Sequence, residues 1–305
     1  MDSCVIGTRG SRLALSQAEE IQGRLKTLFP KIDFQIREIE TRGDRTKKLL
    51  ERHSETIGFF TKEIEEALLS GEIDVAVHSL KDLPTKGPDN LEIAAITRRE
   101  NPQDALVTTD GRSLSQLADG SRIGTGSARR KSQLLKFNPT FEVIGVRGNL
   151  DTRFRKLEEK RFNALVLAMA GLSRFGAEVK KVWPIPYETM LPAPGQGALA
   201  VQIRKKDQEL GKIVSRLDDP ETRCCVTAER AFLSCLGGGC QLPLGALGCL
   251  QNGELVLEGV LMREDGEKGI REGLRASRSE PVKAGERLGE KFLEKGADAL
   301  LNDKG

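Results

Sequence analysis

The stretch Ile123-Gly124-Thr125-Gly126-Ser127-Ala128-Arg129-Arg130 joins a short apolar run to a turn and then to two arginines. The apolar run is typical of a buried strand, and Ser127 can cap the helix that follows. In open α/β sheets, ligands bind beyond the carboxyl ends of the strands. The stretch therefore predicts an α/β fold with a crevice for an anionic ligand. Four further runs end in the same way: Val5–Gly7 before Arg9, Val75–Val77 before Lys81 and Asp82, Val143–Val146 before Arg147, and Leu165–Leu167 before a turn that ends at Arg174.

Two consecutive segments share this alternation of strands and helices. In the first, an apolar stripe from Ala14 to Leu28 predicts a helix that Ser11 caps and that ends before Pro30. The second begins near Asn101 and repeats the order of strand, turn and helix. Such alternation is typical of a mostly parallel sheet, so we expect two similar lobes. The expected strands are 34–39, 73–77, 104–108 and 121–125, and the expected helices are 61–70 and 127–137.

The C-terminal part begins after the proline-rich stretch 183–194. Residues 199–203 alternate as a strand that we expect to return to the first lobe. The run Asp218-Asp219-Pro220 supplies an N-cap and an initial proline for a helix. Beyond it, Asn252-Gly253 between two apolar runs predicts a β-hairpin, and a helix over 282–294 follows. We expect domain 1 to comprise 1–98 and 198–216, domain 2 to comprise 102–193, and a smaller α/β domain to comprise 218–305.

The composition excludes several classes of partner. A net charge of +3 over 305 residues gives no reason to expect a nucleic acid or a membrane surface as partner. The longest apolar run, 164–172, is shorter than the roughly 18 residues that span a bilayer, and we expect a cytoplasmic protein. The six cysteines form no CxxC pair and there are two histidines, so neither a metal site nor a disulfide framework fits well.

Three segments contain chemically distinctive groups. Ser127 with Arg129 and Arg130 can hold carboxylates or phosphates, although a solvated helix surface has the same composition. The pair Lys81-Asp82 offers a carboxylate that can stabilise a cation or exchange a proton with a leaving amine; a local ion pair is the alternative. Gly237-Gly238-Gly239-Cys240 has more glycines than a helix C-cap needs, and its thiol is accessible for a covalent bond.

Six motifs together resemble the porphobilinogen deaminase (hydroxymethylbilane synthase) family, in order and over almost the whole chain. They are Gly7–Ser11, His78–Pro84, Gly124–Arg130, Val146–Arg153, Pro194–Ala198 and Gly238–Pro243. The resemblance implies three α/β domains, of which the first two are arranged like the lobes of type II periplasmic binding proteins. It implies a transferase of tetrapyrrole biosynthesis that joins four porphobilinogen molecules head to tail, with loss of ammonia, to give hydroxymethylbilane. It also implies a monomer.

The resemblance further implies a dipyrromethane cofactor, bound by a thioether to Cys240, on which the chain grows. Asp82 matches the catalytic carboxylate, and the segment 43–58 matches a flexible loop of the family that we expect to act as a lid. The residues implied to hold the cofactor are Lys81, Asp82, Thr125, Ser127, Arg129, Arg130, Arg153 and Cys240. Those implied to position the substrate and the growing chain are Arg9, Ser11, Gln17, Arg147, Arg153 and Arg174.

Two other functions are compatible with parts of the pattern. A non-catalytic two-lobed protein that binds a carboxylate metabolite would explain the arginines but not Cys240. An acyl transferase with a cysteine nucleophile would lose activity when the resting enzyme is alkylated, whereas a thiol already bound to a cofactor would resist alkylation.

Overall fold

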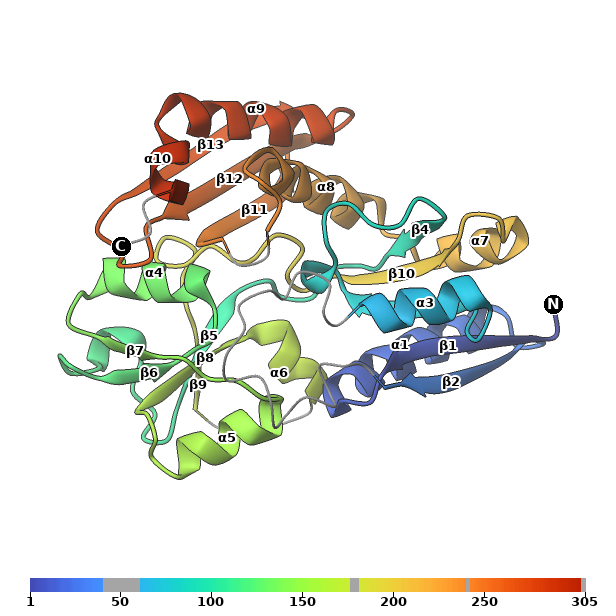
Figure 1. Ribbon diagram of the computed structural model, residues 1–305, viewed down its shortest axis with the longest axis horizontal. Coiled ribbons are helices and arrows are strands. Elements are labelled where there is room, and N and C mark those ends of the chain that lie inside the picture. Colours follow the sequence, from blue (N-terminus) through green and yellow to red (C-terminus); the bar gives the residue numbers. More distant parts are fainter. Residues whose placement is uncertain (41–60, 176–180, 240–241, 303–305) are drawn as a thin grey trace. The chain divides into compact units, whose positions relative to one another are not determined.

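The structure is a computed structural model that describes residues 1–40, 61–175, 181–239 and 242–302. The chain forms two compact units, whose segments alternate in the sequence. Unit 1 comprises Met1–Glu100 and Gly197–Arg223, and unit 2 comprises Asn101–Gln196 and Cys224–Gly305 (Figure 1). Each contains a five-stranded mixed sheet, and unit 2 contains a further three-stranded sheet. The α/β fold class predicted from the sequence is confirmed. The expected lid 43–58 lies outside the described residues.

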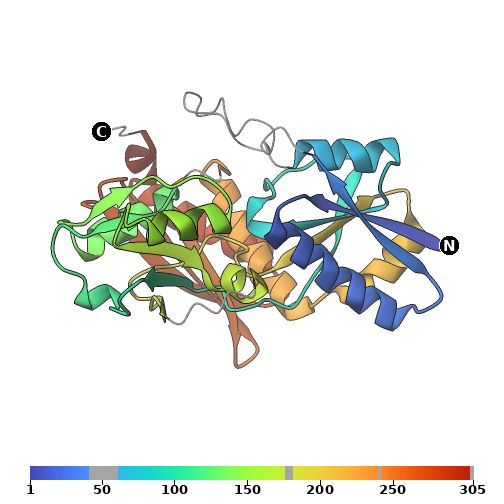
Figure 2. The same cartoon turned by 90° about the horizontal axis from the view of Figure 1, so that it is seen from below.

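The sheet of unit 1 has three parallel strands followed by a strand that runs the other way. Helix α1 (Arg12–Leu28) and α7 (Gln208–Val214) cover one face, and α3 (Lys62–Ser70) covers the other (Figure 2). The strand order is β2 (Asp33–Ile39), β1 (Ser3–Arg9), β3 (Val75–Ser79), β10 (Leu199–Arg204) and β4 (Leu91–Ile96). β10 pairs antiparallel with both β3 and β4.

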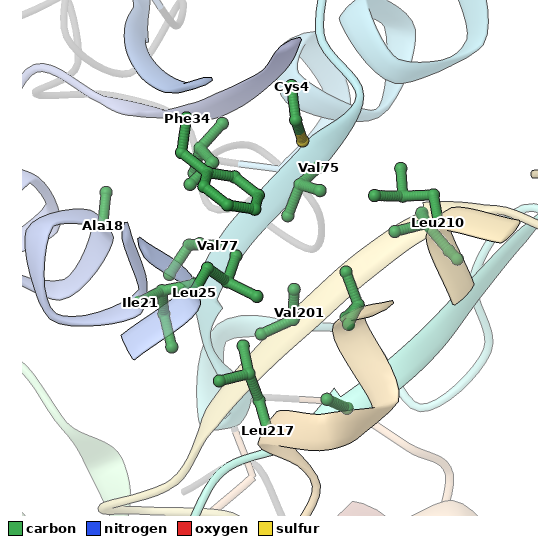
Figure 3. Close-up of a cluster of buried hydrophobic side chains, with 14 of the residues drawn as sticks. Cys4, Ala18, Ile21, Leu25, Phe34, Val75, Val77, Val201, Leu210 and Leu217 are labelled. Carbon is green, nitrogen blue, oxygen red and sulfur yellow. The ribbon is translucent and has the colours of Figure 1, made fainter. Parts of the chain in front are cut away.

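The core of unit 1 explains most of the predicted apolar stripe. Ala18, Ile21 and Leu25 of α1 pack beside Phe34 and Val77 and are fully or almost fully buried (Figure 3). Leu28, the last residue of the predicted stripe, is 44% exposed. The helix predicted from the stripe is confirmed, with Ser11 as its cap and its end before Pro30, and Leu28 is exposed because it is the last residue of the helix.

The first sheet of unit 2 has its reversed strand in the same place as the sheet of unit 1, although this strand comes first in the chain order of unit 2 and last in that of unit 1. Its order is β7 (Glu142–Ile144), β6 (Arg122–Gly124), β8 (Ala164–Ala168), β5 (Asp104–Thr108) and β9 (Val182–Pro184). β6 is parallel to β7 and β8, whereas β5 is antiparallel to β8 and β9. Helix α4 (Ala128–Phe137) packs on one face, and α5 (Leu150–Glu158) and α6 (Met169–Phe175) pack on the other. Residues 170–174, expected as a turn, are therefore part of a helix.

The C-terminal part of unit 2 is a three-stranded antiparallel sheet with helices on one face (Figure 1). The predicted hairpin turn is confirmed, because Asn252 and Gly253 both have left-handed φ angles of 52° and 82°. The strands are β11 (Leu244–Gln251), β12 (Glu254–Met262) and β13 (Gly269–Ser277), and the helices are α8 (Pro220–Cys235), α9 (Pro281–Glu294) and α10 (Ala297–Asn302). β13 and α10 were not predicted from the sequence.

Candidate functional site

The predicted site residues of unit 1 lie at one edge of its sheet. β1 and β3 are parallel neighbours, with Gly7 opposite Ala76, so their carboxyl ends meet at that edge. β1 ends at Arg9, which is half-buried, and Ser11 caps α1. The Ser11 hydroxyl oxygen accepts a hydrogen bond from the backbone N–H of Ala14 at 3.3 Å. The hydroxyl hydrogen can still be donated to an anionic ligand.

Gln17 is engaged within unit 1. Its side chain is 5% exposed, and its Nε2 donates to the hydroxyl of Ser79 at 2.9 Å. The same hydroxyl donates to Gln17 Oε1 at 3.2 Å. These bonds fix the first turns of α1 against the end of β3. The substrate-binding role expected for Gln17 stays a prediction.

Lys81 and Asp82 lie on a single 3₁₀ turn, Leu80–Asp82, directly after β3. The backbone N–H of Leu80 donates to the carbonyl of Ala198 at 3.0 Å, and Leu80 and Leu83 are buried on either side of the pair. Lys81 is half-buried and Asp82 is exposed. The turn therefore presents the Asp82 carboxylate to solvent from a firmly packed backbone.

The predicted site residues of unit 2 also follow neighbouring parallel strands. Ser127 caps α4 and accepts a hydrogen bond from the backbone N–H of Arg130 at 3.4 Å. Buried Thr125 donates through its backbone to the carbonyl of Ile144 at 2.9 Å, which joins the ends of β6 and β7. Arg147 follows β7 and is exposed.

Two more arginines lie on the helices that follow this edge of unit 2. Arg153 on α5 is half-buried, and its Nε donates to the carbonyl of Gly148 at 2.9 Å. Arg174 is in the last turn of α6 and is half-buried. Arg147, Arg153 and Arg174 therefore follow the carboxyl ends of the parallel strands β7 and β8, as the sequence pattern predicted.

One interpretation of the sequence placed Arg129 and Arg130 on a solvated helix surface. The structure contradicts that interpretation. The two arginines are 4% and 6% exposed, and both bind Asp104, which is fully buried. Arg129 Nη1 lies 2.6 Å from Asp104 Oδ2, and Arg130 Nη2 and Nε lie 2.7 and 3.0 Å from Oδ1. Asp104 is opposite Ala168 in the antiparallel pair, so it lies where the parallel strand β8 ends. Sequence reasoning placed Asp104 at the start of a strand but gave it no role.

This buried cluster has more positive than negative charge. Burial alone would raise the pKa of Asp104, but the charges and hydrogen bonds of Arg129 and Arg130 outweigh burial and hold that pKa well below its usual range. Two guanidinium groups thus share one carboxylate. Arg129 Nε is buried and has no hydrogen-bond partner in the described part of the chain. An anionic group placed there would satisfy the N–H and balance the charge.

Glu229 on α8 is a second buried carboxylate that the sequence did not single out. Its two oxygens accept hydrogen bonds of 2.7 Å from the backbone N–H groups of Gly195 and Gly248. α8 leads into the glycine loop, where Gly237 and Gly238 have left-handed φ angles of 99° and 69°. The N–H of Gly238 donates to the carbonyl of Leu233 at 2.8 Å, so part of the glycine run ends the helix. Cys240, the expected anchor, lies outside the described residues.

Neither a metal site nor a membrane-spanning helix is found in the described ranges. Among the residues with assigned positions, no group of three or more His, Cys, Asp or Glu side chains could hold a metal ion. Within the same part of the chain, no helix is long and apolar enough to cross a membrane.

Comparison with known proteins identifies the family. Residues 4–212 match the family model described as porphobilinogen deaminase, dipyrromethane cofactor binding domain, and residues 223–294 match the model of the porphobilinogen deaminase C-terminal domain. The chain belongs to the porphobilinogen deaminase family. It is 45% identical over 296 residues to a porphobilinogen deaminase of Pelotomaculum thermopropionicum, covering 97% of this chain and 95% of that one. It is 42% identical to that of Brevibacillus brevis, covering 97% and 96%.

Solved structures with a similar chain path include a methionine-binding protein. Its TM-score is 0.46 at 15% identity, over 71% of this chain and 89% of that chain.

The described residues fit the cofactor that the family model names. A dipyrromethane made from porphobilinogen bears acetate and propionate side chains, and carboxylates are the anions that guanidinium groups bind best. The unpartnered Nε of Arg129 and the excess positive charge around Asp104 suit such a carboxylate. The family assignment favours neither a non-catalytic carboxylate-binding protein nor a cysteine acyl transferase.

Proposed function

We propose that the protein is a transferase that joins four porphobilinogen molecules head to tail, releases ammonia at each addition, and yields hydroxymethylbilane. The observation that carries this proposal is the family match together with the buried arginine cluster of unit 2, whose charge suits a carboxylate-rich ligand. We assign the dipyrromethane cofactor to Cys240. When bound, that cofactor supplies the pyrrole terminus to which each new unit is added.

We propose distinct tasks for the two sets of side chains. Arg129, Arg130 and Arg153, together with the hydroxyls of Thr125 and Ser127 and the ammonium of Lys81, hold the carboxylates of the cofactor. Arg9, Ser11, Gln17, Arg147 and Arg174 position the incoming pyrrole and the growing chain, Arg153 taking part in this as well. In both sets, paired N–H groups fix a planar carboxylate in orientation as well as in place.

Asp82 has the catalytic role in this proposal. Loss of ammonia from porphobilinogen leaves positive charge on the pyrrole, and a fixed carboxylate close to that charge lowers the barrier. The 3₁₀ turn supports this role, because Leu80 and Leu83 are buried on either side while Asp82 is exposed. The preorganised carboxylate needs no rearrangement as the charge develops.

We also propose the finer organisation that the resemblance implies. The proposed domains are domain 1 (1–98 and 198–216), domain 2 (102–193) and a C-terminal domain (218–305). The gap between the two family matches, after residue 212 and before residue 223, supports the start of the C-terminal domain, and the extent of unit 1 supports that of domain 1. We further infer a monomer that acts in the cytoplasm without a nucleic-acid or membrane partner. Light scattering of the purified protein measures its oligomeric state.

The decisive experiment is the intact mass of the denatured protein. Wild type should carry extra mass equal to one dipyrromethane and should give a colour with an acidic aldehyde reagent for pyrroles. Cys240→Ala should lack both, whereas the control Cys249→Ala, which alters a different thiol that is half-buried, should keep both. A wild-type protein that remains unmodified after incubation with porphobilinogen would refute the proposal in favour of a non-catalytic carboxylate-binding protein.

A further inference from the structure

Asp104 is the acidic residue at the centre of the buried arginine cluster, and the family roles described above leave it without a task. It is the first residue of β5 and is fully buried. Because β5 runs antiparallel to β8, its first residue lies beside the carboxyl end of β8 rather than at the opposite edge of the sheet. The reversed strand thus brings an acid to the same edge as the arginines.

The carboxylate fixes the orientation of Arg130. Nε and Nη2 of Arg130 both donate to Asp104 Oδ1, at 3.0 and 2.7 Å, and Nη1 donates to the carbonyl of Val166 at 3.0 Å. Contacts on three of the guanidinium nitrogens define the plane of the group. One hydrogen on each of the two terminal nitrogens is left to meet a ligand.

Arg129 is held along one side of its guanidinium group. Nη1 donates to Asp104 Oδ2 at 2.6 Å and to the carbonyl of Leu191 at 2.7 Å. Its Nε, on the other side, is the buried nitrogen without a partner among the described residues. Gln133 strengthens this arrangement, because its side chain bonds both the N–H and the carbonyl of Leu191. Asp104 and Leu191 therefore determine which edge of the Arg129 guanidinium group is left for a ligand, namely the edge with Nε–H.

A third segment also binds the same carboxylate. Gln196 Nε2 donates to Asp104 Oδ1 at 3.0 Å and to the carbonyl of Pro102 at 2.6 Å. Gln196 is fully buried, as is Asp104. Hydrogen bonds from α4 and from the segment before Gly197 thus converge on one side chain, which restricts its own movement.

We propose that Asp104 is a positioning residue, which keeps Arg129 and Arg130 charged and oriented so that their remaining N–H groups meet a cofactor carboxylate. It supplies half of the negative charge that the two arginines require, and the ligand supplies the other half. This inference rests on the proposed function. A neutral residue at position 104 would leave two uncompensated guanidinium groups free to turn. A further acidic residue beside Asp104 would instead neutralise the positive charge that attracts the ligand.

The test compares Asp104→Asn with Asp207→Asn. Asp207 is the matched control, because it binds Arg204 Nε at 2.5 Å in unit 1 and both side chains are largely buried. Each variant is checked for folding by circular dichroism, and cofactor loading is followed by intact mass as a function of porphobilinogen concentration. We expect Asp104→Asn to raise the half-saturating concentration by about tenfold or more, because breaking a buried charged pair is costly. Asp207→Asn should stay within about twofold of wild type.

A folded Asp104→Asn protein that loads like wild type would overturn the proposal while leaving the proposed function intact. A wild-type protein that never acquires the cofactor mass would instead refute the function, and with it this role. If Asp104→Asn does not fold, the proposal is tested by nitrogen NMR of the arginine side chains. The spectra of cofactor-loaded wild type and of Cys240→Ser are compared. The Nε–H signal of Arg129 should shift on loading, whereas that of Arg130, already bonded to Asp104, should not. A shift of the Arg130 signal as large as that of Arg129 would show that the pair does not persist, and would overturn the proposal.

Discussion

Replacing Glu229 by Gln should destabilise unit 2 strongly. Glu229 is fully buried on α8, and its two carboxylate oxygens accept 2.7 Å hydrogen bonds from the N–H groups of Gly195 and Gly248. Glutamine has one oxygen, so one backbone N–H would face the amide NH₂ instead. The change loses a charged hydrogen bond, worth about 1.5–3 kcal/mol, and leaves buried donors facing each other, at a cost of about 1–3 kcal/mol.

The expected loss in the free energy of unfolding is therefore about 2.5–6 kcal/mol. For a unit of this size, that loss corresponds to a fall in the unfolding midpoint of roughly 10 °C. Thermal unfolding followed by circular dichroism measures it, and urea unfolding gives the free energy independently. The control is Glu221→Gln, an exposed position in the first turn of the same helix, where the loss should be about 1 kcal/mol or less. Equal midpoints for the two variants would refute the reasoning.

Three further outcomes are expected. Asp82→Asn should keep the cofactor mass but lower kcat by about 10²–10³, since a fixed charge next to the developing cation is removed; near-normal turnover would exclude Asp82 from catalysis. Gly285→Ala should lower the unfolding midpoint by several degrees, because the new Cβ would lie 2.3 Å from the carbonyl oxygen of Ala228 and α9 would have to move away from α8; an unchanged midpoint would contradict this packing. Burial, and next the charge of Asp74, raise the pKa of the Cys4 thiol from 9.0 to about 12. The folded state thus holds this proton more tightly than the unfolded state, so Cys4 contributes stability below about pH 9 that is lost as the pH rises to about 12. In urea unfolding, the free energy of unfolding of Cys4→Ala should therefore fall less steeply than that of wild type as the pH is raised over this range.

The elements that could be predicted from the sequence are those that local chemistry defines. Ser11 and Ser127 cap the helices expected of them, and Asp219 accepts a hydrogen bond from the N–H of Thr222 at the start of α8. Asn252-Gly253 forms its hairpin because few other residues tolerate two left-handed φ angles in succession. Each of these features depends on contacts within a few residues.

The features that were missed depend on contacts between distant residues. Asp104 and Arg130 are 26 residues apart in sequence, and Glu229 is 34 from Gly195, so no local pattern indicates either pairing. β13 was missed because its alternating residues are exposed or half-buried, which leaves a weak apolar signal. The grouping of arginines at strand ends was predictable, whereas the carboxylate that shares two of them required the reversed direction of β5 to be known.

The late position of the reversed strand β10 in the sequence has a consequence for synthesis on the ribosome. β10 lies between β3 and β4, so β4, which ends at Ile96, has no neighbour in its sheet until Leu199 and the residues after it have emerged. About 100 residues separate the two strands, which corresponds to a delay of about 5–20 s at ordinary rates of translation. All five strands of the first sheet of unit 2 are made within that interval. The later part of the chain can therefore complete its sheet first, and the N-terminal sheet has an open strand edge throughout the delay, exposed to other nascent chains.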